Sequence, residues 1–296
     1  MTRPAGDVAP RISVIIATFN RAHMLRCAIR SVLAQDFTDF ELLVVGDRCT
    51  DESSQVVASF DDPRVQWLNR DENCGSQWGP NNDGIARARG ELIAFLGHDD
   101  LWLPWHLSTL LPLIDAGADL SHPIIALLAP GHLVGVYAQP PNGETYATTF
   151  IPPSGWLVRK SVLQSLGGFR DHRTTTKGTD HDLLARLFRA RHRIVAVPRL
   201  TVLKFPSQFW RAYAADAAVP QEEWLAKDPF EVERQVLTDA VVRNHSLGTT
   251  AAFFRAVRSS ASRIVRRFFD DDGILTPLLR ARHRRQFEAR KLRRGL

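Results

Sequence analysis

The 296-residue chain is 44% apolar and 24% charged, which allows at least one large hydrophobic core without stabilising cross-links. Its three cysteines show no CxxC spacing, and its N-terminus and apolar runs fit neither a signal peptide nor a membrane span, so we expect a cytoplasmic protein. The net charge of +6 is uneven: residues 251–296 carry thirteen basic and four acidic side chains, leaving about −3 for the rest.

The first third of the chain alternates between apolar runs and segments with helical spacing. The runs are short and rich in β-branched residues, as expected of parallel strands that are buried on both faces. The expected strands are 12–18, 40–45, 65–68 and 92–96, and the expected helices are 21–34, 51–60 and 82–89. This rhythm predicts an α/β fold with a Rossmann-like, doubly wound and mostly parallel sheet.

The alternation of predicted strands and helices is less regular after residue 103. A helix is expected over 104–114, whereas 119–153 mixes apolar segments with Pro and Gly and fits no single element. A strand over 155–159 and a helix over 161–166 follow, and Thr179 is expected to be the N-cap of a helix over 179–190.

We divide the chain into three regions. Residues 1–10 are expected to form a flexible leader, 11–205 an α/β domain, and 206–296 a helical, basic C-terminal extension.

An amphipathic segment at 253–269 places phenylalanines among arginines. It can be a helix packed on the main domain with a solvated basic face. It can also be an interfacial helix that binds anionic lipid, since basic and aromatic faces suit a headgroup boundary. A third reading, nucleic-acid binding, is not the one we expect.

Polar side chains follow several predicted strands at the edge where open α/β sheets bind ligands. The sequence Ala17 to Arg21, ATFNR, ends the first strand, and its backbone N–H groups and Phe19 can hold a nucleotide base. Asp47 follows the second strand, where its carboxylate can accept hydrogen bonds from a base or a ribose, or can be an ordinary turn residue. Asp51 is expected to cap the next helix.

The most informative segment is ELIAFLGHDDLWL, in which a buried strand ends in Asp99 and Asp100. Carboxylates at a strand end suit Mg²⁺ or Mn²⁺, which need only one or two of them beside phosphates and water. The alternative is a pair that braces the loop, and His98 is expected to be a loop residue. Asp180, in the first turn of a predicted helix, is favoured in its ionised form and can act as a general base, or can simply decorate the helix start.

Taken in order, ISVIIATFNR, FELLVVGDRCTDES, NNDGIARARGELIAFLGHDDLWLP and GGFRDHRTTTKGTDHDLLARL resemble the motif series of family 2 glycosyltransferases with the GT-A fold. The resemblance covers residues 11–200 and implies an inverting enzyme that moves a sugar from a nucleoside-diphosphate sugar to an acceptor hydroxyl. It implies Asp180 as the catalytic base and Asp100, beside Asp99, as the direct ligand of Mg²⁺ or Mn²⁺. The implied nucleotide-binding residues are Ala17, Thr18, Phe19, Arg21, Asp47, Asn82 and Asp99. The resemblance also implies that 11–205 is the catalytic domain, with 11–103 as its nucleotide-sugar-binding half and 104–205 as its acceptor-binding half.

The resemblance further implies a UDP-sugar donor, a glycan or lipid-linked acceptor, and a role in cell-surface polysaccharide or other glycan synthesis at the inner face of the cell membrane. The chain departs from the family pattern at Gly46, Gly97 and Thr179, where acidic residues are usual, and it has no His near Lys204. These departures leave two alternatives open: a catalytically impaired sugar-nucleotide-binding protein, and a retaining or nucleotidyl-transferring GT-A-like enzyme.

Overall fold

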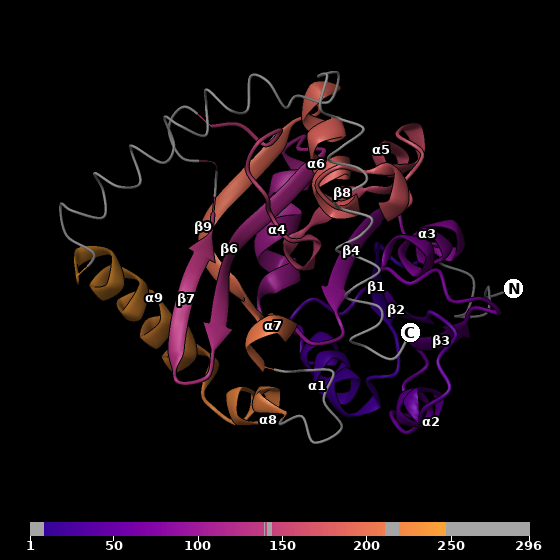
Figure 1. The fold of residues 1–296 in the computed structure, drawn as a ribbon, viewed down its shortest axis with the longest axis horizontal. Helices are drawn as coiled ribbons and strands as arrows, with labels where there is room; N and C mark the ends of the chain where they lie inside the picture. Colours follow the sequence, from indigo (N-terminus) through magenta and orange to yellow (C-terminus); the bar gives the residue numbers. More distant parts are fainter. Residues whose placement is uncertain (1–8, 139, 141–143, 211–218, 247–296) are drawn as a thin grey trace, which may run out of the picture.

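The computed structural model describes residues 9–138, 140, 144–210 and 219–246. Its centre is one nine-stranded sheet in the order β3-β2-β1-β4-β8-β6-β9-β5, with β7 paired to β6 (Figure 1). Strands from both halves of the predicted catalytic domain therefore belong to a single continuous sheet.

The first part of the sheet is parallel, as predicted. It consists of β1 (Ile12–Thr18), β2 (Phe40–Gly46), β3 (Val65–Asn69) and β4 (Leu92–Gly97), connected through α1 (Ala22–Leu33), α2 (Ser53–Ala58) and α3 (Trp78–Arg87). All of β2 and nearly all of β1 and β4 are buried, which explains their continuous apolar sequence. Because β1 lies between β2 and β4 in parallel register, the three strands end at the same edge of the sheet.

The second part of the sheet is mixed. It contains β5 (Leu101–Trp102), β6 (Leu120–Ala129), β7 (His132–Tyr137), β8 (Leu157–Arg159) and β9 (Ile194–Lys204). Strand β8 runs antiparallel to β4 and β6, whereas β6 and β9 are parallel to each other. The segment 119–153, which fits no single element in the sequence, contains the β6–β7 hairpin. Its pattern is broken by Pro123 within β6 and by a register shift at Leu127/Leu128.

The helices of this part are α4 (His106–Asp115), α5 (Lys160–Ser165) and α6 (Thr179–Arg189), with single 3₁₀ turns η1 (Pro153–Gly155) and η2 (His172–Thr174). The prediction that Thr179 is the N-cap of α6 is wrong. Gly178 takes that place with φ +109°, and the Thr179 hydroxyl donates instead to the backbone oxygen of Arg170 at 2.7 Å.

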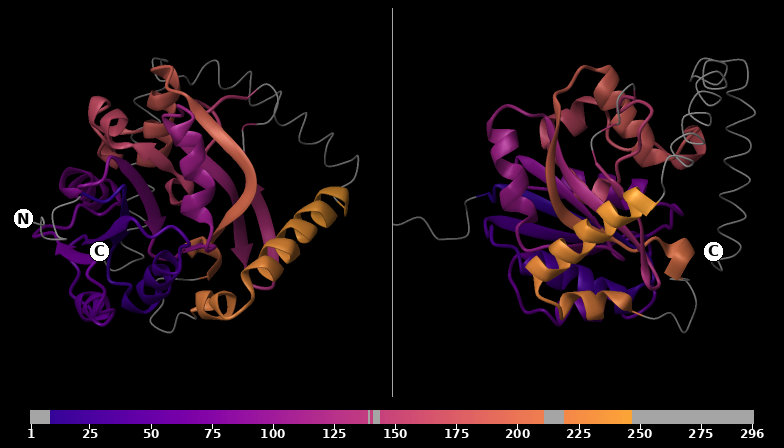
Figure 2. Two further views of the ribbon diagram at one scale, coloured as in Figure 1. Left: turned by 180° about the vertical axis from the view of Figure 1, so that it is seen from behind. Right: turned by 90° about the vertical axis from the view of Figure 1, so that its left-hand side faces the viewer.

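In the described part of the chain, three helices follow β9: α7 (Ser207–Trp210), α8 (Pro220–Leu225) and α9 (Pro229–Ser246). They cover a second apolar cluster that is separate from the main core beneath β1 and β4. Helix α9 packs against β7 and β9 (Figures 1 and 2). The amphipathic segment 253–269 lies outside the described residues, and no helix among the residues that are described is long and apolar enough to cross a membrane.

Candidate active site

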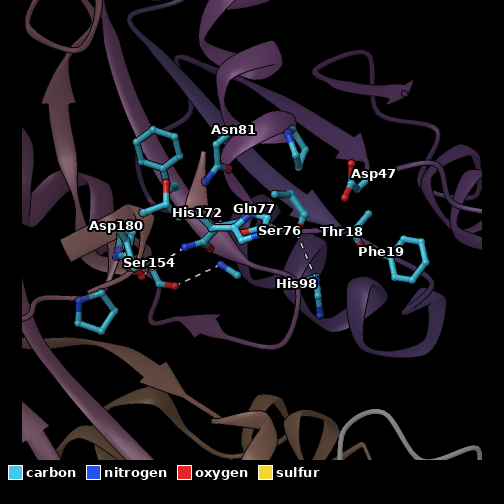
Figure 3. A pocket seen from close by; sticks show the side chains of 18 of the residues that line it. Thr18, Phe19, Asp47, Ser76, Gln77, Asn81, His98, Ser154, His172 and Asp180 are labelled. Atoms are coloured by element: carbon cyan, nitrogen blue, oxygen red, sulfur yellow. Dashed lines mark hydrogen bonds between the residues drawn. The ribbon is translucent and has the colours of Figure 1, made fainter. Parts of the chain in front are cut away.

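A cavity of about 440 Å³ opens where β1, β2 and β4 end. One wall comes from the residues that follow these strands and from the loop that enters α3. The opposite wall comes from residues 150–154, the start of α6 and the end of β9. Phe19 and Asp47 lie toward one end of the cavity and Asp180 toward the other (Figure 3).

The end of β1 provides the first three predicted nucleotide-binding residues. Ala17, Thr18 and Phe19 all line the cavity. The Thr18 side chain is buried, and its Oγ1 has no hydrogen-bond partner in the described part of the chain. A buried hydroxyl without a partner is costly, so a polar ligand atom in the cavity would stabilise this position.

Asp47 also lines the cavity, but its carboxylate is already engaged. Oδ1 accepts hydrogen bonds from Arg70 Nη1 at 2.7 Å and from the Cys74 N–H at 3.0 Å, and Oδ2 accepts from the Gly75 N–H at 3.0 Å. Asp47 therefore holds the loop that enters α3, and this loop forms much of the cavity wall.

The two carboxylates after β4 have different environments. Asp99 is half-buried and lines the cavity, and no described residue donates a hydrogen bond to its carboxylate. Asp100 is fully buried outside the lining. Its Oδ2 accepts from Ser154 Oγ at 2.5 Å and from Lys204 Nζ at 2.7 Å, and its Oδ1 accepts from the Phe205 N–H at 3.2 Å.

These contacts do not fit the prediction that Asp100 is the direct metal ligand, because an ammonium and two neutral donors already occupy its carboxylate. Within the described residues, no group of three or more His, Cys, Asp or Glu side chains is placed to hold a metal ion. Gly97 adds no ligand, and a Cβ there would approach Asp100 Oδ2 to 2.8 Å. The donor set fits a divalent cation that arrives with phosphate oxygens and is held by Asp99, since Mg²⁺ commonly takes one or two carboxylates plus phosphates.

Asp180 projects from the first turn of α6 into the cavity. Its Oδ1 accepts from the His181 N–H at 2.9 Å, and its Oδ2 accepts from Gln77 Nε2 at 3.3 Å. Burial raises the pKa of the Asp180 carboxyl, an effect that the His181 N–H and the positive charge of Lys204 oppose. The contact with Gln77 connects the loop beside Asp47 to the candidate base.

Two predicted nucleotide-binding residues do not line the cavity. The Asn82 amide makes two hydrogen bonds to the Phe169 backbone: Nδ2 donates to the Phe169 oxygen at 2.8 Å, and Oδ1 accepts from the Phe169 N–H at 2.9 Å. The neighbouring Asn81 lines the cavity. Arg21 Nη1 donates to the Asn20 oxygen at 2.7 Å, next to the start of α1. The structure thus gives both residues contacts that organise the chain around the site.

Several cavity residues were absent from the sequence prediction. Most stand in loops or single 3₁₀ turns without a periodic signal, and one stands in α3: Asn73, Ser76, Gln77, Phe150, Ser154, His172 and Lys177, and Asn81 in the helix. Lys204 had a usable signal, because it is a charged residue at the end of an apolar strand, and Asp47 and Asp99 likewise stand close to the ends of their own strands.

Parallel strands that end together at a polar cavity, with acidic side chains at both of its ends, define an α/β protein of the GT-A glycosyltransferase fold. Residues 13–127 match the family model described as glycosyl transferase family 2.

Curated relatives match about a third of this chain. The GalNAc(5)-diNAcBac-PP-undecaprenol beta-1,3-glucosyltransferase of Campylobacter jejuni is 40% identical over 111 residues, which cover 36% of this chain and 36% of that protein. The UDP-Glc:alpha-D-GlcNAc-diphosphoundecaprenol beta-1,3-glucosyltransferase of Escherichia coli is 35% identical over 92 residues, covering 31% and 36%. The match therefore spans about a third of the length of these relatives.

Solved structures share the fold over most of the described chain. Residues 1–349 of TarS from S. aureus, in complex with UDP, align with a TM-score of 0.57 at 20% identity, covering 82% of this chain and 74% of that one. The mannosyltransferase PcManGT from Pyrobaculum calidifontis, in complex with GDP-Man and Mn²⁺, aligns with a TM-score of 0.53 at 16% identity, covering 88% and 82%.

Proposed function

We propose that this chain is an inverting glycosyltransferase that moves a sugar from a nucleoside-diphosphate sugar to an acceptor hydroxyl. The main support for this proposal is that the ends of β1, β2 and β4 and the side chain of Asp180 line the same cavity, with Asp180 on the opposite wall. This arrangement matches the fold-level rule that open α/β sheets bind nucleotides at the carboxyl ends of their strands.

The residues divide the reaction between two ends of the cavity. Thr18 and Phe19 hold the base and ribose, and the loop fixed by Asp47 closes over them. The ionised Asp180 takes the proton of the acceptor hydroxyl as that oxygen attacks the anomeric carbon from the side opposite the diphosphate. One displacement of this kind inverts the anomeric configuration.

A divalent cation would neutralise charge on the departing diphosphate. Mg²⁺ or Mn²⁺ would be held by Asp99, whose carboxylate is accessible, and not by Asp100, which is paired with Lys204. The family resemblance instead implies Asp100 as the direct ligand, with Asp99 beside it.

The acceptor is proposed to be a lipid-linked glycan at a membrane surface, and the donor a UDP-sugar. Support comes from the names of the curated relatives, two of which act on undecaprenol-linked substrates, and from the neighbour that binds UDP. A role in polysaccharide synthesis agrees with a further relative, a succinoglycan biosynthesis protein of Rhizobium meliloti, 38% identical over 122 residues.

Replacing the candidate base tests the reaction directly. Purified protein is supplied with a panel of UDP- and GDP-sugars and undecaprenyl-diphosphate-linked acceptors, and both transfer and donor hydrolysis are measured. Asp180→Asn should retain nucleotide binding and lose transfer by about 10²- to 10⁴-fold, the usual cost of losing a general base.

Asp182→Asn is the matched control, because Asp182 lies in the same first turn of α6 and pairs with Arg186, outside the cavity lining. Near-normal turnover of Asp180→Asn would contradict the assignment of the base. Transfer with retained anomeric configuration would contradict the single-displacement mechanism.

A further inference from the structure

We propose that Lys204 is a built-in cation for the donor's diphosphate, so that this chain binds a nucleoside diphosphate even when no divalent metal is present. The inference rests on the proposed function, because it requires the cavity to hold a nucleotide. It concerns how one residue of this chain recognises phosphate.

Lys204 is placed at the cavity by the fold. It is the last residue of β9, its side chain is 24% exposed, and it lines the cavity together with Asp99 and Asp180. Burial disfavours the charged form of Lys204, but the charges of Asp100, Asp99 and Asp180 outweigh this effect and raise the pKa of the ammonium.

The ammonium has hydrogen-bonding capacity to spare. A lysine ammonium offers three donors, and the hydrogen bond of Lys204 within the described chain goes to Asp100 Oδ2 at 2.7 Å. The remaining donors can serve ligand oxygens in the cavity. Phosphate oxygens suit this position, because charge-assisted hydrogen bonds between an ammonium and a phosphate are stronger than neutral ones.

Asp100 and Ser154 hold the ammonium in place. Asp100 is fully buried, and the Ser154 hydroxyl and the Phe205 N–H fix its carboxylate from two further directions. A lysine anchored in this way loses little side-chain freedom when a ligand binds, so more of the interaction energy contributes to affinity.

The surroundings explain why a fixed cation is useful here. Gly97 adds no carboxylate beside Asp99, and Asp100 is neutralised by its partner, so Asp99 is the one carboxylate after β4 that faces the cavity. Such a site attracts a divalent ion weakly until phosphate oxygens complete its ligand set. Lys204 supplies positive charge independently of that ion.

The test is equilibrium binding of UDP and of GDP to the full-length protein, by titration calorimetry, in EDTA and in Mn²⁺. Lys204→Met alone would leave Asp100 buried without a partner and could unfold the protein. The double variant Lys204→Gln with Asp100→Asn removes both charges and retains hydrogen-bonding groups. Lys227→Met is the control, because Lys227 pairs with Glu223 on α8, away from the cavity.

In EDTA, the wild-type protein and Lys227→Met should bind the nucleotide with similar affinity. The double variant should bind about 10- to 100-fold more weakly, as expected for the loss of a hydrogen bond to a charged group. Thermal unfolding followed by circular dichroism verifies that the double variant is folded.

Equal affinity of the folded double variant and the wild type in EDTA would overturn the inference, as would wild-type binding that requires Mn²⁺. If the double variant is unfolded, the comparison of wild-type binding in EDTA and in Mn²⁺ decides the inference: binding in EDTA supports it, and binding that requires Mn²⁺ overturns it. Failure of the wild type to bind either nucleotide under both conditions would instead overturn the proposed function and the role of Lys204 with it.

Discussion

Asp99 and Asp100 are adjacent in sequence and chemically identical, but the fold gives them different environments. They lie in the turn that follows β4, where the Asp100 N–H donates to the Gly97 oxygen at 3.0 Å. In this turn Asp99 lines the cavity, whereas Asp100 contacts Lys204 and Ser154. A residue-level reading of the motif cannot distinguish the two side chains, because the partner Lys204 is 104 positions away.

The raised pKa of Asp180 predicts the pH dependence of transfer. Burial raises this pKa above its ordinary value, and only the ionised carboxylate can accept the acceptor's proton. Transfer should therefore decline as the pH falls through that raised pKa, with a midpoint above the ordinary aspartate value of about 3.9. The measurement is kcat/KM as a function of pH.

The Gln77 amide donates to Asp180 and favours its ionised form. Gln77→Leu should consequently move the acidic limb to higher pH. An acidic limb at or below the ordinary aspartate range in the wild type would show that Asp180 is not the titrating base.

At the scale of elements, α3 is tied to the chain that precedes α6. Asn82, on α3, makes two hydrogen bonds to the backbone of the buried Phe169, and Gly168 adopts φ +66° where a Cβ would lie 2.4 Å from Asn82 Oδ1. This close contact positions the loop that leads to Asp180 relative to the loop that carries Gln77.

Asn82→Ala should lower the free energy of unfolding by about 1–3 kcal/mol, because the buried N–H and carbonyl of Phe169 lose their partner. The affinity for UDP should stay close to that of the wild type, since Asn82 does not line the cavity. Denaturant unfolding and nucleotide titration are the two measurements, and Arg87→Ala, at an exposed position of the same helix, is the control.

A variant with unchanged stability and strongly reduced UDP affinity would favour the original prediction that Asn82 binds nucleotide. It would also show that the two hydrogen bonds between Asn82 and the Phe169 backbone contribute little to the free energy of unfolding.

At the scale of the whole molecule, the sheet joins the nucleotide end of the cavity to its other wall. Strand β8 connects β4 to β6 through antiparallel pairing, and Gln221 on α8 donates to the backbone oxygen of Asp99 at 2.8 Å. Residues beyond 205 therefore contact the site, so the predicted boundary between the domain and the C-terminal extension does not separate two independent structures at this point.

The uneven charge of the chain predicts binding to anionic membranes. Residues 251–296 carry thirteen basic and four acidic side chains, and basic residues near a surface attract anionic lipid by about 1 kcal/mol each. The full-length protein should float with vesicles containing phosphatidylglycerol and should float less in high salt, in a sucrose-gradient assay.

Vesicles of phosphatidylcholine alone are the control for charge, and a chain ending at residue 246 is the control for the segment. Equal flotation of the shortened chain would refute the prediction. Strong, salt-sensitive binding of DNA by the full-length chain, in place of flotation, would favour the nucleic-acid reading of the basic region.

The sequence by itself determined the parallel strands β1 to β4 and the existence of helix α6, because buried strands and amphipathic helices leave local periodic patterns. It also identified the polar residues that follow these strands. The order of these motifs predicted the GT-A fold, which the comparisons confirm.

Only the tertiary structure decided which of these residues share a cavity and what their partners are. The β6–β7 hairpin was hidden by Pro123 and a register shift, and the loop residues Gln77 and Ser154 carry no periodic signal. Lys204 contacts Asp100 through pairing of strands far apart in sequence. Local patterns report burial and backbone geometry, whereas the role of a carboxylate depends on charges and donors that the fold brings from elsewhere in the chain.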